Sequence, residues 1–222
     1  DWSSDVCSSD LITSLGNTNI FFPRNTGREA FQMYWTLLII TIFKTGYTFQ
    51  SLKLGTALLG LFTVPFVYQL GKEYGGTRVA FFALFLFGVA SWPNIISRIG
   101  LRFPLYPLFV APTLLYLIRG LRTQNRNDFI LSGIFLGIGL HGYSPIRILP
   151  FLVAVVVLIY ILHVKSGAER RQAIFWFLLV ALVSAFVFSP LLRYWIAFPE
   201  NFAYRSLTRL SSLETPLPGP AW

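Results

Sequence analysis

Hydrophobic and polar positions fall into long blocks along this chain instead of alternating residue by residue. Six apolar stretches hold no Asp, Glu, Lys or Arg, and short polar segments separate them: residues 54–70, 79–96, 103–118, 129–143, 148–164 and 173–192. A helix needs about 20 apolar residues, from about 17 upward, to cross roughly 30 Å of hydrocarbon. The pattern predicts an all-α integral membrane protein, a multi-pass helical bundle of about six spans. The third and fourth spans are marginal in length.

A seventh apolar stretch, residues 31–43, is shorter and is interrupted by three polar residues. A stretch of this length favours an interfacial or re-entrant segment over a span. Tyr34 and Trp35 suit a helix that lies at the level of the lipid head groups. We therefore predict an outer juxtamembrane helix here, within an outer loop that covers residues 11–53.

Basic residues are distributed unevenly between the loops. Eight of them lie in the alternate loops 72–78, 119–128 and 165–172, whereas the loops between hold Arg98, Arg102 and Arg147. The positive-inside rule places the richer set in the cytoplasm. The segment before residue 54 and the tail after Arg193 are then outside.

Composition agrees with a membrane protein and excludes other classes. Of 222 residues, 55% are hydrophobic, 17% aromatic and only 12% charged, against about 25% charged in average chains. The mean hydropathy is +0.62. A disordered chain, a nucleic-acid-binding domain and a disulfide-rich secreted domain are all excluded. The net charge of +9 is better explained by loops at a membrane surface.

Both ends of the chain differ from the apolar middle. Residues 1–10 hold three of the nine acids and the single cysteine. They resemble a translated sequencing adaptor, and we expect a scar rather than a genuine polar N-terminus. Without them no cysteine is left to indicate a redox compartment. The six-span region then covers residues 54–196, and residues 197–222 are expected to be the truncated start of a later outer loop.

Few acids are available for chemistry. Glu73, Asp128 and Glu169 lie in the basic loops and are most simply solvated loop charges. Glu29 lies next to Arg28, just ahead of the predicted outer helix. There it is placed either to meet the head group of a lipid-linked substrate or to act as a charge in the first helical turn.

The outer loops carry arginines that suit phosphate recognition through paired hydrogen bonds. This interpretation is slightly favoured for Arg98 and Arg102. Anchoring to lipid head groups is favoured for Arg147 and Arg193.

Other motifs indicate packing rather than a site. His141 and His163 lie on different sides in this topology, so no zinc site is predicted. Gly133, Gly137 and Gly139 form a small-residue face on the fourth span, which is typical of close helix packing.

Several strings resemble, in order and spacing, the GT-C membrane glycosyltransferases, and most closely the glycosyltransferase family 39 or protein-mannosyltransferase-like group. The segment Asn25-Thr26-Gly27-Arg28-Glu29 looks like the Gly-Arg-Glu-Pro segment in the first outer loop of bacterial members. The other strings lie at residues 54–76, 91–93, 97–98, 190–194 and 198–205.

The resemblance implies a GT-C-like bundle that transfers a hexosyl or pentosyl group from a polyprenyl-phosphate donor. The acceptor would be a glycan, lipid or protein at the outer face of a bacterial-type plasma membrane, in the cell envelope. The implied catalytic residues are Glu29 and Arg28, and Arg98, Arg102 and Tyr143 would bind substrate. Besides the donor, membrane lipids are expected partners and nucleic acid is not. No cofactor is identified, and a divalent metal is left open.

Two departures from the family pattern matter. The principal catalytic acid, usually an Asp-Glu pair after the first span, would lie upstream of Leu11. Ala30 stands where the family commonly has proline. We therefore expect the chain to be inactive alone. The alternative functions are a multi-pass transporter or lipid flippase, which more often shows a charged residue in mid-membrane, and a scaffold without chemistry.

Overall fold

The computed structural model describes residues 21–22, 28–142 and 144–197 of the chain. Apart from two strands of two residues each, the described chain is helical, which confirms the predicted all-α class. The elements are β1 (Phe21–Phe22), β2 (Arg28–Glu29), α2 (Phe31–Phe43), α3 (Phe49–Val89), α4 (Ser91–Ile99), α5 (Leu105–Thr123), α6 (Arg126–Leu140), the 3-10 helix η1 (Ser144–Ile148), α7 (Leu149–His163) and α8 (Gly167–Ala197).

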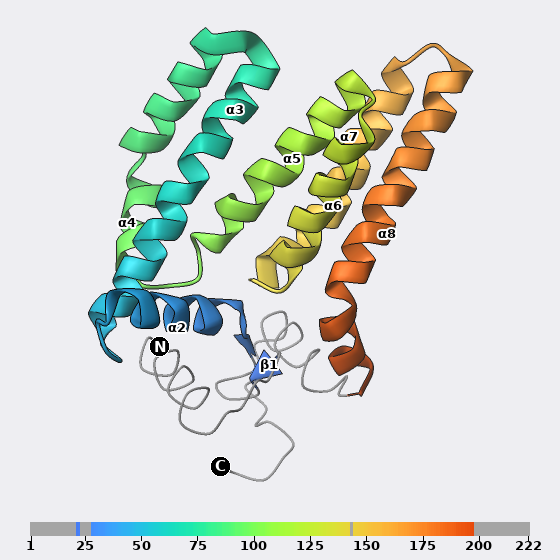
Figure 1. Cartoon of the computed structure of the whole chain (residues 1–222). Helices are drawn as coiled ribbons and strands as arrows, with labels where there is room; N and C mark the ends of the chain where they lie inside the picture. Colours follow the sequence, from blue (N-terminus) through green and yellow to red (C-terminus); the bar gives the residue numbers. More distant parts are fainter. Residues whose placement is uncertain (1–20, 23–27, 143, 198–222) are drawn as a thin grey trace, which may run out of the picture.

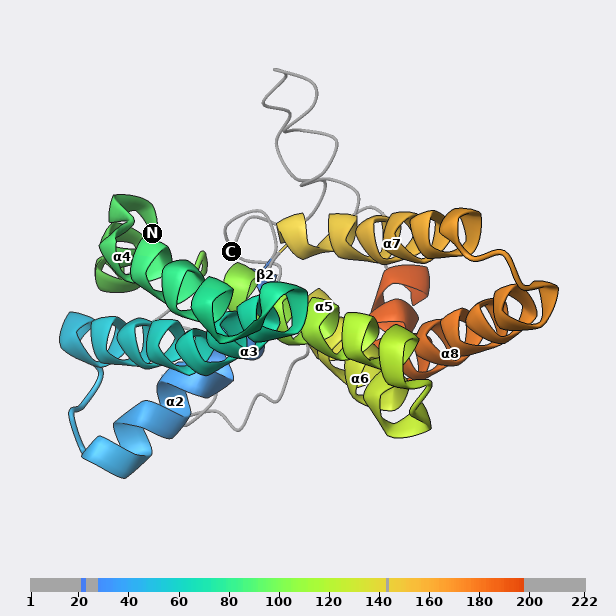
Figure 2. The same cartoon turned by 90° about the horizontal axis from the view of Figure 1, so that it is seen from above.

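The helices run up and down as a bundle, and α2 lies crosswise at one end of it (Figure 1). Seen along the bundle, α5 and α6 lie in the centre, α3 and α4 lie on one side of them, and α7 and α8 lie on the other (Figure 2). The helix predicted at residues 31–43 is confirmed with the same bounds. Its crosswise placement suits a helix at a membrane surface, and its location at the head groups stays a prediction.

α3 is a hairpin, because its backbone leaves the helical conformation at Gly75 and Gly76. Gly76 has φ +79°, a left-handed conformation that only glycine adopts without cost. The two arms touch closely, since a Cβ on Gly71 would lie 2.9 Å from Cα of Ala80. One continuous element therefore crosses the bundle twice.

The expectation of one unbroken span over residues 79–96 is wrong. Ala90 has φ −59° and ψ 122°, and it separates α3 from α4. Pro93 explains the break, because it cannot donate to the carbonyl of Val89 and its ring would clash there. The side chain of Asn94 instead donates to the carbonyl of Ala90 at 2.9 Å.

Small residues let α6 approach its neighbours, as the sequence predicted. A Cβ on Gly133 would lie 2.9 Å from the carbonyl oxygen of Val180, and one on Gly137 would lie 2.6 Å from Cβ of Val187. Both neighbours belong to α8. On the α5 side, the buried Ser132 hydroxyl donates to the carbonyl of Thr113 at 3.0 Å. The glycine face is thus a packing surface.

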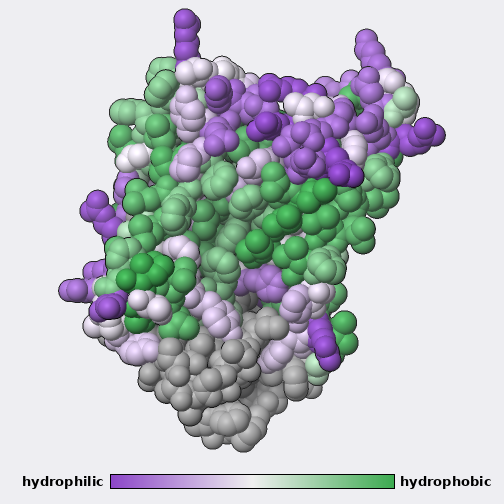
Figure 3. Space-filling view, viewed as in Figure 1, coloured by the Kyte–Doolittle hydropathy of each residue, from purple (hydrophilic) through white to green (hydrophobic). Residues whose placement is uncertain are grey.

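On the face shown in Figure 3, apolar side chains form a belt across the middle of the bundle, and polar ones gather towards its ends. Large hydrophobic residues are exposed in this belt, including Phe85, Phe151 and Phe186. In the described residues, three helices are long and apolar enough to cross a membrane: Phe49–Val89, Pro145–His163 and Gly167–Ala197. The chain is an integral membrane protein. The count of six spans stays a prediction, since α6 has only 15 residues.

The three basic loops lie together at one end of the bundle, opposite α2 (Figures 1 and 3). We call this the basic end, and the end that carries α2 the α2 end. The predicted alternation of the loops is therefore confirmed, whereas the cytoplasmic side of the basic end stays a prediction.

Two acids at the basic end differ from the solvated charges that the sequence suggested. Asp128 is only 5% exposed, lies 3.6 Å from Nε of Arg119 and accepts a hydrogen bond from Thr123 at 3.3 Å. Glu73, whose side chain is 14% exposed, pairs with Arg122 at 2.8 Å. Helix ends lie close together here, so both carboxylates lie between helices. Each forms an ion pair with an arginine of α5.

Candidate functional site at the α2 end

The backbone of Arg28 and Glu29 forms β2, which pairs antiparallel with β1. Ala30 is the N-cap of α2, and the first turn of α2 holds no acid. The alternative that Glu29 is a charge within the first helical turn is therefore wrong. Glu29 ends a strand instead, directly before the helix that crosses the α2 end (Figure 1).

Aromatic contacts fix α2 against the bundle. The indole Nε1 of Trp35 donates to the carbonyl of Gly55 in α3 at 2.9 Å. Phe31, two residues after Glu29, packs edge-on against Phe109 of α5 with ring centroids 5.3 Å apart. The start of α2, and with it β2, is thereby held at the N-terminal half of α5.

Tyr34 is the ionisable residue of α2. Burial raises the pKa of its hydroxyl above the ordinary value of 10.0. The hydroxyl therefore stays neutral in the physiological range and adds no charge to this end.

Gln32 joins α2 to the segment between α4 and α5. Its side chain is almost fully buried, and Nε2 donates to the carbonyl of Gly100 at 3.4 Å. Within the described residues, its Oε1 accepts no hydrogen bond. Sequence reasoning treated this residue only as an interruption of an apolar stretch. A lone amide in such a stretch was the available signal, because a buried amide requires partners.

The segment that Gln32 contacts turns sharply and buries an arginine. Gly100 ends α4 with φ +77°, and a Cβ there would lie 3.3 Å from the ring of Phe49. Two residues later, Arg102 is only 7% exposed. The turn therefore brings Arg102 in from the surface, on the segment that is hydrogen-bonded to the first turn of α2.

The other residues considered for substrate binding or lipid anchoring are placed differently. Arg98 lies in the last turn of α4 and is exposed, whereas Arg102 is buried. Arg147 is half-buried in η1, and Arg193 is exposed on α8. Tyr143 lies outside the described residues.

His141 also lies at this end, at the C-terminus of α6. Its Nε2 is 3.0 Å from the carbonyl of Val187, and its ring contacts Phe188. These contacts tie α6 to α8. Among the described residues, no group of three or more His, Cys, Asp or Glu could hold a metal ion.

The structure thus gathers one acid-bearing strand and an arginine-bearing turn at the α2 end. Of the acids in the described residues, Glu29 alone lies there. A carboxylate can accept a proton, and guanidinium groups bind phosphate oxygens. This combination suits transfer of a group from a phosphate-containing donor.

A family model described as "Dolichyl-phosphate-mannose-protein mannosyltransferase" matches residues 29–195. The match begins at Glu29 and extends through almost all of α8. No curated protein matches the chain, and no solved structure does.

Proposed function

Because the chain belongs to the dolichyl-phosphate-mannose-protein mannosyltransferase family, a membrane glycosyltransferase family that uses a lipid-linked sugar donor, we propose a specific reaction for it. The protein transfers a hexosyl or pentosyl group from a polyprenyl-phosphate donor to an acceptor. The reaction takes place at the outer face of a bacterial-type plasma membrane, at the α2 end of the bundle.

One observation carries this proposal most strongly. The strand that ends in Glu29 leads into α2, whose first turn is hydrogen-bonded to the turn before the buried Arg102. A potential base and a potential phosphate ligand therefore lie on directly connected segments.

In the proposed step, the acceptor hydroxyl attacks the anomeric carbon of the sugar. The bond from that carbon to the phosphate oxygen breaks, and polyprenyl phosphate leaves with the electron pair. Glu29 accepts the hydroxyl proton as general base. Arg102 stabilises the charge that develops on the leaving phosphate, and Arg28, which precedes Glu29 in the chain, and the exposed Arg98 have supporting roles.

The test is the substitution Glu29→Gln in the full-length protein. Loss of a general base lowers the transfer rate by about 10²–10⁴-fold, measured with a radiolabelled polyprenyl-phosphate sugar. The matched control is Glu169→Gln, which removes an exposed acid at the basic end and leaves the rate unchanged. An unchanged rate in Glu29→Gln removes Glu29 from the site.

A further inference from the structure

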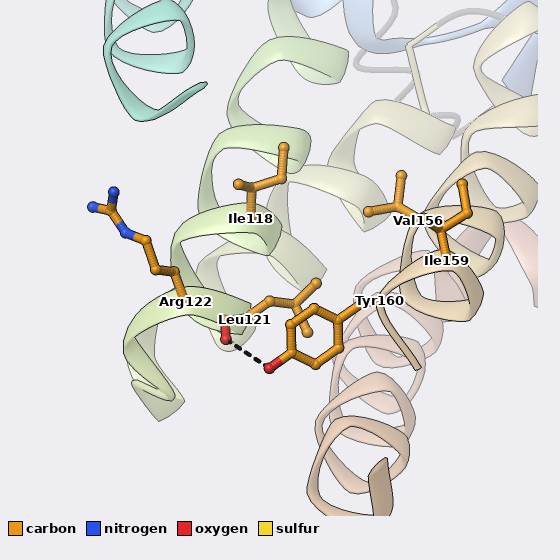
Figure 4. A pocket seen from close by; sticks show the side chains of 6 residues that line it. All are labelled: Ile118, Leu121, Arg122, Val156, Ile159 and Tyr160. Atoms are coloured by element: carbon orange, nitrogen blue, oxygen red, sulfur yellow. Dashed lines mark hydrogen bonds between the residues drawn. The ribbon is translucent and has the colours of Figure 1, made fainter. Parts of the chain in front are cut away.

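A groove opens between α5 and α7 in the half of the bundle near the basic end (Figure 4). It has a volume of about 500 Å³ and is lined by Ile118, Leu121, Arg122, Val156, Ile159 and Tyr160. We call it the α5–α7 groove. Four of its six lining side chains are aliphatic, so its walls suit a hydrocarbon chain.

The end of the α5–α7 groove is closed by a polar network. The Tyr160 hydroxyl donates to the carbonyl of Leu121 at 3.3 Å and accepts from Nε2 of Gln124 at 3.4 Å. Oε1 of Gln124 in turn accepts from the indole of Trp176 at 3.0 Å. These bonds join the ends of α5 and α7 to α8. The groove therefore has a fixed polar end and apolar walls, which is the polarity of a lipid with its head group at the surface.

Charge at this end indicates which head group fits. The three basic loops hold eight basic residues against three acids, Glu73, Asp128 and Glu169. Arg122 lines the groove, and its guanidinium points away from Tyr160, on the side of α5 opposite Val156 and Ile159 (Figure 4). Its side chain is 64% exposed and forms an ion pair with Glu73, with NH2 2.8 Å from Oε1, while a guanidinium carries five donors in all. On the α7 side, Nε of Arg170 donates to the carbonyl of Val164, one turn beyond Tyr160.

We propose that the α5–α7 groove binds a membrane glycerophospholipid with an anionic head group. One acyl chain lies against the aliphatic walls, and the phosphate lies at the rim beside Arg122. Basic pockets between membrane helices are known to take anionic head groups in this way. The bound lipid also fills the space between the lining side chains of α5 and α7.

The occupant is distinct from the lipid-linked sugar donor of the proposed reaction. α5 has 19 residues and is therefore about 28 Å long at 1.5 Å per residue. Arg102 precedes the start of α5, and Arg122 lies in its last turn. A phosphate at the rim is therefore about a helix length away from one at Arg102, and one lipid phosphate does not serve both positions.

The first experiment is native mass spectrometry of the full-length protein released from nanodiscs of phosphatidylcholine with a minor fraction of phosphatidylglycerol. The wild-type protein is expected to retain phosphatidylglycerol in preference to phosphatidylcholine. Val156→Trp fills the groove and abolishes this retention. The matched control is Val155→Trp on the neighbouring outward face of α7, where Val155 is 48% exposed, and it retains the lipid as wild type does.

A pair of charge variants tests the head group without relying on a bulky substitution. Glu73→Gln removes the acid that competes for Arg122, so retention of phosphatidylglycerol rises by about fivefold. Adding Arg122→Gln restores the net charge of the wild type but removes the guanidinium, and retention falls to about fivefold below wild type. Lys72→Gln, an exposed charge on the same end outside the groove, has a smaller effect than the double variant.

Three results overturn the proposal. The first is equal retention of phosphatidylglycerol and phosphatidylcholine by the wild-type protein. The second is equal retention by Val156→Trp and Val155→Trp, or no response to the charge pair. The third is replacement of the bound phospholipid by polyprenyl phosphate when both are supplied. Sugar transfer is not a readout here, so failure of this proposal leaves the proposed reaction unaffected.

Discussion

Both ends of the bundle are rich in arginine, but they differ in the number of acids that lie near the arginines. At the basic end, Arg119 and Arg122 lie against acids that come from a neighbouring helix, Asp128 of α6 and Glu73 of α3. At the α2 end, Glu29 is the single acid among the described residues. Arginines there come from β2, α4, the α4–α5 turn, η1 and α8.

Among the described residues, the basic end therefore holds ion pairs between helices, and the α2 end holds an excess of cations over acids. A guanidinium that is matched with a neighbouring carboxylate holds helices together and has less to offer a ligand. Several cations with one carboxylate are instead suited to a doubly charged phosphate and to one proton transfer. We therefore expect substitutions at the α2 end to lower activity and substitutions at the helix contacts to lower stability.

Among further variants, the largest effect is expected from Arg102→Gln. Removing one preorganised donor to developing charge costs about 10²-fold in rate or more, so sugar transfer falls by about this factor. The control is Arg126→Gln, which removes an exposed arginine at the basic end and leaves the rate unchanged. If both variants lose activity equally, the two ends are not functionally distinct.

The next largest effect is expected from a substitution in the packing of α6 against α8. Gly137→Ala places a methyl group 2.6 Å from Cβ of Val187, and such overpacking costs about 1–3 kcal/mol. Thermal unfolding in detergent should show the loss. Gly88→Ala is the control, since a Cβ there meets nothing within 4 Å and alanine is the better helix former. Equal stability of the two variants would contradict close α6–α8 packing.

Asp128→Asn is expected to lower the free energy of unfolding by about 1–2 kcal/mol, because a largely buried carboxylate loses its charge beside Arg119. The transfer rate per folded molecule should stay at the wild-type value. Parallel unfolding and activity measurements on the same preparation check both parts. A lower rate with normal stability would give the basic end a role in the reaction.

The smallest effect is expected from Gln32→Met, which keeps the side-chain length and removes the hydrogen bond to Gly100. A net hydrogen bond is worth about 1 kcal/mol, so the KM for the donor rises by about fivefold while kcat changes less. Thr41→Val on the exposed side of α2 is the control. A fall in kcat alone would mean that Gln32 does not position the Arg102 turn for donor binding.

Much of the fold follows from the apolar pattern. The helix at residues 31–43, the alternation of the loops and the packing role of Gly133 and Gly137 are confirmed, because each depends on local periodicity or residue size. The break at Ala90 was missed, since the apolar run continues through Pro93 and masks the lost backbone hydrogen bond. The missing N–H group and the ring of Pro93 break the helix there, although the apolar run continues.

Only part of the candidate site could be predicted from the sequence. Glu29 and Arg102 were identified, but nothing local distinguishes the buried Arg102 from the exposed Arg98. That difference arises from the left-handed turn at Gly100 and its contact with Gln32 on a distant helix. The burial of Asp128 likewise depends on how α5 and α6 pack against each other. The local sequence pattern does not give this tertiary contact.

The most direct test of the account is a photo-crosslink between the full-length protein and a polyprenyl-phosphate sugar with a photoreactive group next to the phosphate. Mapping the labelled peptides locates the donor phosphate without relying on any substitution. The account predicts labels on α2 and on residues 100–104, at the α2 end. Labels confined to residues 119–128 or 165–172 would place the donor at the basic end and contradict it.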